Sequence, residues 1–74
     1  MSKLIRMDGS GHTTVAEWSR SDPASVEAAV AAFRAELEQG ALAVVSEGEG
    51  QATQVRELPL DADLVILRRP IAGG

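Results

Sequence analysis

A chain of 74 residues has room for one small domain, because domains average about 100–200 residues. Hydrophobic residues make up 45% of the sequence, which is typical of a globular chain and too high for a disordered one. The sequence has no cysteine, which excludes disulfides, thiolate metal sites and thiol catalysis. Seven basic and eleven acidic residues give a net charge of −4. Proteins that bind nucleic acid usually carry a basic surplus, so we do not expect this chain to bind nucleic acid.

Membrane and export signals are also missing from the sequence. No apolar run approaches the roughly 18 residues of a membrane span, and residues 1–8 lack the apolar core of a signal peptide. We therefore expect a cytoplasmic protein that does not contact a membrane.

The first predicted element is a β-hairpin. Lys3–Asp8 is rich in Leu, Ile and Met, and Thr13–Trp18 carries β-branched and aromatic residues. The turn between them contains glycines, which adopt positive φ without steric cost. Trp18 ends the hairpin and is expected either to cap the open end of the core or to lie exposed as a partner-binding anchor, because Trp is enriched at binding hot spots.

A single helix is predicted over Pro23–Gln39. Asp22 suits a capping position before it, Pro23 suits its first turn, and Gly40 suits a left-handed end. Apolar residues recur at spacings of three and four and form one stripe: Val26, Ala29, Val30, Phe33 and Leu37. Polar residues fall elsewhere and are expected to face water: Glu27, Arg34, Glu36, Glu38 and Gln39.

Three further strands are expected after the helix. Leu42–Val45 is a short apolar run, and Thr53–Leu58, ended by Pro59, is expected to pair with it as a second hairpin. Leu60–Asp63 is predicted as a connection with helix-turn character. Leu64–Leu67 is the most apolar strand, and its lack of alternation indicates burial on both sides or a central position in the sheet.

The predicted order β-β-α-β-β-β gives an α+β fold in which one helix packs on a mixed sheet. We expect the last strand to insert between the two hairpins beside the first strand, which is the β-grasp arrangement. With the ending Leu64–Arg69 and a final Gly73-Gly74, the chain resembles the ubiquitin-like β-grasp family, which includes ubiquitin and the sulfur carriers of thiamin and molybdopterin synthesis. Residues 1–70 would form the domain and residues 71–74 a C-terminal Gly-Gly tail.

The resemblance implies a carrier or modifier that is activated at its C-terminal carboxylate. In such families an adenylating enzyme threads the tail through a narrow channel, adenylates the carboxylate, and passes it to a thiol or converts it to a thiocarboxylate. Gly73 and Gly74 have no side chains and would fit the channel, and the carboxylate of Gly74 would be the reactive group. Arg68 and Arg69 would bind acidic residues of the adenylating enzyme. The sequence shows no Ser–His–Asp set, no paired carboxylates and no cofactor motif, and a domain of this size has little room for a pocket, so we expect neither an enzyme nor a cofactor.

A second interpretation is a small interaction or structural module without C-terminal chemistry. Examples are an adaptor or an accessory protein of a phage or mobile element, which binds partners by an exposed face or a free edge strand. Gly73-Gly74 would then be a chain end at which nothing packs. The two interpretations differ in whether Gly74 reacts.

The other polar residues favour structural roles. His12 is the single histidine, and a metal or catalytic site needs partners at fixed spacing. Gly9-Ser10-Gly11 lacks the lysine and the helix of a phosphate-binding loop. The aspartates Asp22, Asp61 and Asp63 are expected at a cap and at turns rather than around calcium.

Three arginines raise one further possibility. Arg56, Arg68 and Arg69 would form a basic strip if the fourth and fifth strands were near each other. Otherwise they lie at ordinary solvated strand ends, and this second placement is the one that we expect.

Overall fold

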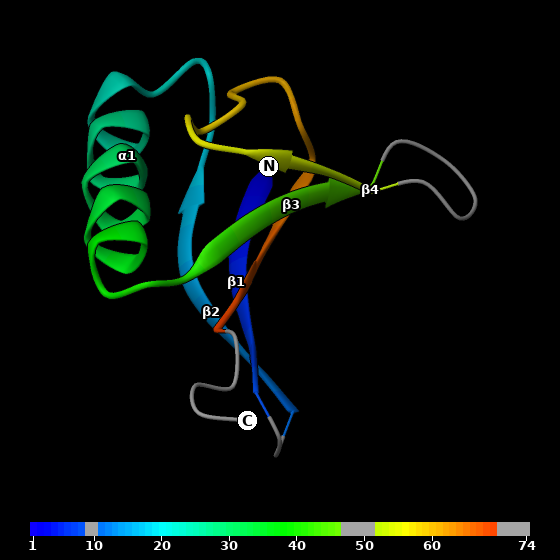
Figure 1. Cartoon of the computed structure of the whole chain (residues 1–74). Helices are drawn as coiled ribbons and strands as arrows, with labels where there is room; N and C mark the ends of the chain where they lie inside the picture. The colour runs from blue at the N-terminus through cyan, green and yellow to red at the C-terminus, as the bar shows by residue number, and fades with distance from the viewer. Residues whose placement is uncertain (9–10, 47–51, 70–74) are drawn as a thin grey trace, which may run out of the picture.

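The structure, a computed structural model, describes residues 1–8, 11–46 and 52–69. Within them the chain forms two strands, a helix and three more strands, which confirms the predicted order (Figure 1). The elements are β1 (Ser2–Asp8), β2 (Gly11–Trp18), α1 (Pro23–Glu38), β3 (Leu42–Ser46), β4 (Ala52–Val55) and β5 (Leu64–Arg68).

The strands form one mixed five-stranded sheet in the order β2-β1-β5-β3-β4. β1 and β5 run parallel, and the other neighbouring strands run antiparallel. The last strand therefore lies between the two hairpins and beside the first strand, as predicted. Because β1 and β5 run in the same direction, both end at the same edge of the sheet, and α1 lies along one face (Figure 1).

The signals at both ends of the predicted helix are confirmed. Asp22 is extended, and its Oδ1 accepts a hydrogen bond from the Ser25 N–H at 3.4 Å, while Pro23 occupies the first turn. Gly40 has a φ of +96°, a conformation that strains any residue with a Cβ. The helix ends one residue earlier than predicted, because Gln39, its C-cap, has a φ of −86° and a ψ of 3° and so leaves the helical conformation.

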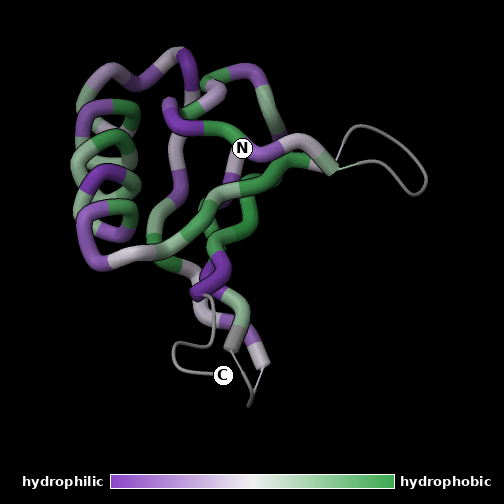
Figure 2. The backbone as a smooth tube through the Cα atoms, in the orientation of Figure 1, coloured by the Kyte–Doolittle hydropathy of each residue, from purple (hydrophilic) through white to green (hydrophobic). Residues whose placement is uncertain are grey.

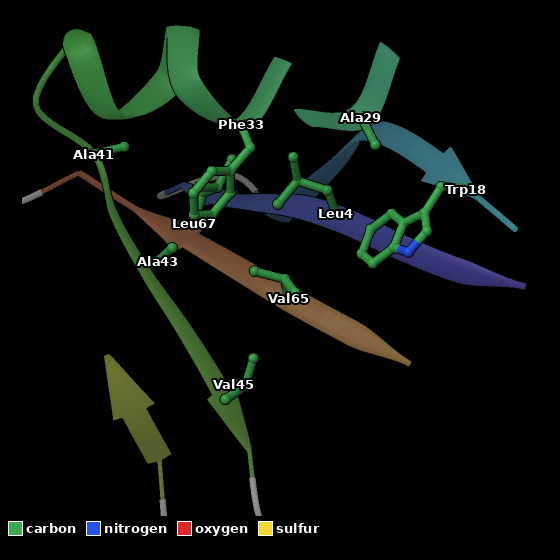
Figure 3. Packing of buried hydrophobic residues seen from close by; sticks show 9 residues of the cluster. All are labelled: Leu4, Trp18, Ala29, Phe33, Ala41, Ala43, Val45, Val65 and Leu67. Atoms are coloured by element: carbon green, nitrogen blue, oxygen red, sulfur yellow. The ribbon is translucent and has the colours of Figure 1, made fainter. Parts of the chain in front are cut away.

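The core fills the space between α1 and the sheet. Figure 3 shows Ala29 and Phe33 pointing from the helix toward Leu4, Val65 and Leu67 on the two central strands. Figure 2 shows hydrophobic residues following these strands, whereas α1 alternates between hydrophobic and hydrophilic stretches. The buried hydrophobic residues are Leu4, Trp18, Ala29, Phe33, Ala41, Ala43, Val45, Val65 and Leu67.

Trp18 closes one end of this core. Its side chain has no exposed surface, and its Nε1 donates a hydrogen bond to the Leu60 carbonyl at 3.1 Å. The bond fixes the connection between β4 and β5 against the core. Of the two predicted roles, the structure shows the core cap, and the prediction of an exposed partner-binding Trp18 is wrong, because nothing of this side chain is left for a partner to contact.

The predicted extent of the fourth strand is also wrong. β4 ends at Val55, opposite Ala43, so Pro59 does not end it. The chain instead leaves the sheet after Val55, because Leu58 and Leu60 turn back to pack against the core. The predicted connection then makes a turn in which the Ala62 N–H donates to the Pro59 carbonyl at 3.1 Å.

The central position predicted for the last strand is confirmed, but burial on both of its sides is not. In β5, Val65 and Leu67 are fully buried, whereas Leu64 is 41% exposed and Ile66 is half-buried. Successive side chains of a strand point to opposite faces. β5 is therefore apolar on both faces but buried on only one.

Candidate functional site

Apart from Trp18, the residues predicted to react or to bind partners belong to the last seven positions of the sequence. Arg68 is the last residue of β5 and is exposed, and Arg69 follows it directly. Gly73 and Gly74, with the rest of the predicted tail at 71–74, lie outside the described residues. The described part of the site is therefore the point at which the chain leaves the sheet on its way to the glycines.

Arg69 is held against the end of α1. Its Nη2 donates hydrogen bonds to Glu36 Oε2 at 3.1 Å and to Gln39 Oε1. About half of its side chain stays exposed, with a relative area of 47%. α1 has no basic residue in its own last turn, so Arg69 brings a positive charge to a helix end that favours one.

Glu36 is the main residue that the sequence analysis missed. It was expected to face water, but it is 5% exposed and is the one charged residue buried in the described part of the chain. The signal was present in the helical spacing, because Ala29, Phe33 and Glu36 follow one another at steps of four and three and share the buried stripe. The prediction was wrong because it placed the residue by its charge alone.

Arg6 completes this arrangement from the sheet. Its Nη1 donates a hydrogen bond to Glu36 Oε1 at 2.8 Å, and in the sheet Arg6 lies beside Leu67 of β5. Each oxygen of one carboxylate thus accepts from a different arginine. We call Arg6, Glu36, Gln39 and Arg69 the Glu36 clamp; it joins β1, α1 and the residue after β5.

Two opposing effects set the pKa of the Glu36 carboxyl. Burial raises the pKa, whereas the hydrogen bonds and positive charges of Arg6 and Arg69 lower it. Their combined result is a pKa below the usual value, so the carboxylate is charged at neutral pH. Its chemistry is therefore to hold cations in place rather than to donate a proton.

Arg56, Arg68 and Arg69 were predicted to form a basic strip only if the fourth and fifth strands were near each other, and these strands are not neighbours in the sheet. β3 lies between β4 and β5, so Arg56, which follows β4, is separated from Arg68 by the chain at Leu42. Arg69 is turned to α1 by the clamp.

The face of the sheet opposite α1 carries a row of apolar residues that the sequence analysis did not single out. Ile5, Ile66 and Val44 are neighbours across β1, β5 and β3, and each is half-buried. Around them Met7, Leu42 and Leu64 are 41–42% exposed. We call these six residues the outer face; the one helix among the described residues lies on the other side of the sheet (Figure 1).

The remaining polar candidates stay apart from this site. His12 is exposed on β2, opposite Met7. In residues 1–8, 11–46 and 52–69 there is no group of three His, Asp or Glu residues that would hold a metal ion. Over the same residues, no helix is long and apolar enough to cross a membrane.

Comparison of the chain with protein-family models, with curated proteins and with solved structures finds no match.

Proposed function

We propose that this chain is a ubiquitin-like protein with a β-grasp fold, which acts as a carrier or modifier through the carboxylate of Gly74. The observation that carries this proposal is the strand order β2-β1-β5-β3-β4, with β5 parallel to β1 in the centre of the sheet. A β-grasp requires this order together with one helix across one face. The central strand then leads through Arg68 and Arg69 toward Gly73 and Gly74.

The proposed chemistry takes place on a partner enzyme. The Gly74 carboxylate attacks the α-phosphate of ATP and releases pyrophosphate, which gives an acyl adenylate. A sulfur nucleophile then attacks the acyl carbon and displaces AMP. Hydrosulfide yields a thiocarboxylate in this step, and an enzyme thiolate yields a thioester. The chain is not itself an enzyme in this proposal; it presents a glycine end that fits a narrow channel.

Mass spectrometry of the intact chain tests this function. The chain is expressed with an N-terminal tag in its natural host and purified under denaturing conditions. We expect Gly74 to carry sulfur in place of one carboxylate oxygen, or to be joined to a protein amine. Gly73→Val should abolish the product because its side chain blocks a channel, whereas Ala72→Ser is the matched control that keeps both glycines. Unmodified Gly74 in both the wild type and the control would disprove the proposal.

The outer face favours a second candidate function, a module that binds a protein partner. Its apolar centre is bordered by Lys3 and Arg68, which point to the same face as Ile5 and Ile66, and by Glu17, opposite Lys3. These three described residues carry two positive charges and one negative charge, in a chain with a net charge of −4. The partner that fits is a protein surface with an apolar centre and carboxylates at its rim.

Site-specific photocrosslinking tests this candidate. A benzophenone amino acid at Leu64, on the outer face, should crosslink one partner through peptides that contain Asp or Glu, and Arg68→Glu should abolish the product. The same amino acid at Ala28, which is exposed on α1, is the matched control. Crosslinks only to a second copy of this chain, or equal crosslinking from both positions, would contradict the candidate.

A further inference from the structure

We infer that Glu36 is a positioning residue, which holds Arg69 against the end of α1 and so fixes the point at which the chain leaves the domain toward Gly73 and Gly74. Its role in a reaction of Gly74 rests on the proposed function. The holding of Arg69 does not, and it is measured separately.

The geometry of the clamp is the first argument. Glu36 Oε2 and Gln39 Oε1 both accept from the same nitrogen of Arg69, so two side chains on one helical turn grip the residue that follows β5. The other oxygen, Oε1, is occupied by Arg6 at 2.8 Å. Arg6 thereby fixes the carboxylate in the orientation that Arg69 uses.

The energetics of burial are the second argument. Removing a carboxylate from water is costly, and Glu36 is buried although the side chains of Arg6 and Arg69 keep 34% and 47% of their surface exposed. Position 36 lies on the stripe of Ala29 and Phe33, where an apolar residue would extend the core. A charged residue that is not needed for packing there points to a role in fixing geometry.

The position of Arg69 in the chain is the third argument. Arg69 lies beyond the last strand residue, Arg68, so the sheet does not hold its side chain. The covalent chain limits Gly74 to within about 18 Å of Arg69, since five residues span at most about 3.6 Å each. The Glu36 clamp orders Arg69 before a partner binds Gly74. Binding therefore does not carry the entropic cost of ordering this side chain.

Two variants separate this role from simple stabilisation. Glu36→Gln removes the charge, and Glu36→Met fills the same space with an apolar side chain that supports the core. Both leave Arg6 and Arg69 without a charged partner and are expected to lower the stability of the domain, because removing one member of an ion pair leaves the other charge uncompensated. Glu36→Met keeps no acceptor oxygen and should release Arg69, whereas Glu36→Gln keeps one acceptor oxygen and should release it less. Glu38→Gln is the matched control, because Glu38 is exposed in the same turn.

Limited trypsin digestion measures the holding of Arg69 directly. Cleavage of the Arg68–Arg69 bond reports opening of this segment, and cleavage after Arg34, inside α1, reports opening of the whole domain. We expect Glu36→Met to raise the first rate about tenfold more than the second, because local opening is governed by local contacts. Backbone ¹⁵N relaxation should show lower order at Arg69 but not at Leu67. Unchanged cleavage and order in both Glu36 variants would overturn the inference.

The reaction is then compared in the same variants. At equal protein level, Glu36→Met should give about two- to tenfold less Gly74-modified product, the cost of ordering one side chain at binding. Equal yields from the wild type and Glu36→Met, with Arg69 shown to be released, would overturn the positioning role. No product from the wild type would disprove the proposed function instead, and the digestion would still decide whether Glu36 holds Arg69.

Discussion

The two faces of the sheet use the same central strands for different purposes. On the inner face, Leu4, Val65 and Leu67 meet α1 and are fully buried. On the outer face of β5, Ile66 and Leu64 are equally apolar, yet Ile66 is half-buried and Leu64 is 41% exposed. A step of one residue along β5 thus separates side chains that hold the fold from side chains that remain available for contact.

The charges of the two faces differ in the same way. The inner face buries one carboxylate, Glu36, and neutralises it with two arginines. On the outer face Lys3 and Arg68 form no ion pair with another described residue. Charge on the inner face is therefore paired within the domain, whereas these two charges on the outer face are not paired with another described residue.

Truncation of the largest inner-face residue gives the strongest test of this division. Trp18→Ala removes a fully buried ring and its hydrogen bond to Leu60, and should cost about 3–5 kcal/mol of unfolding free energy. In a chain of this length a single core rarely supplies more than about 3–5 kcal/mol, so the variant should be largely unfolded or close to it. Urea denaturation measures the loss. Trp18→Phe keeps most of the ring and should lose much less; equal losses would show that the hydrogen bond, rather than the packing, dominates.

The sharpest comparison uses two neighbours on β5. Leu67→Ala empties a fully buried site and should cost about 2–5 kcal/mol, whereas Ile66→Ala, on the other face, should cost about 1 kcal/mol. Both variants remove side chains from the same central strand, so effects on strand propensity largely cancel. Urea midpoints at a common protein concentration give the ratio. Equal losses would mean that the outer face is as well covered as the inner one.

The Glu36 clamp should contribute less than the core. Glu36→Gln leaves two arginines without a charged partner and should cost at most about 1.5–3 kcal/mol at neutral pH, the range for hydrogen bonds to charged groups, because water screens arginines that are 34% and 47% exposed. Thermal and urea unfolding of the variant measure this loss. Glu38→Gln, an exposed neighbour, should change stability by less than about 0.5 kcal/mol. Similar effects from the two substitutions would show that the buried pairing adds nothing.

Acid should remove the same contribution from the wild type. The folded state lowers the pKa of Glu36 below its usual 4.5, so the unfolded chain binds more protons in this range and stability rises with pH. The contribution is complete above 4.5 and is lost as the pH falls through the lowered value. The stability difference between the wild type and Glu36→Gln should therefore shrink on acidification. A difference that grows instead would mean that burial, which acts in the opposite direction, dominates.

The sequence predicted the elements well because their signals are local. Asp22 and Pro23 mark the start of α1, Gly40 marks its end, and the apolar run of β5 fits a central strand. What it missed depends on tertiary contacts. The end of β4 is set by Leu58 and Leu60 turning back to the core, which no local pattern records.

The candidate site was less accessible to prediction for the same reason. Arg69 was expected to bind a partner, since an arginine near a chain end carries no sign of where it lies in space. Within the domain it donates a hydrogen bond to Glu36, which stands 33 residues earlier in the chain. Helical spacing places Glu36 on the buried stripe, but only the position of β5 beside β1 brings Arg6 and Arg69 to it.

The smallest effect on stability is expected for a substitution on the outer face. Leu64→Thr places a β-branched residue on an exposed edge of the apolar row and should change stability by less than about 0.5 kcal/mol. Urea unfolding at two protein concentrations measures it. A loss as large as that of Leu67→Ala would show that another part of the chain or a second copy covers this face. Dependence of the loss on protein concentration would identify the second copy, because dilution weakens association and leaves contacts within one chain unchanged.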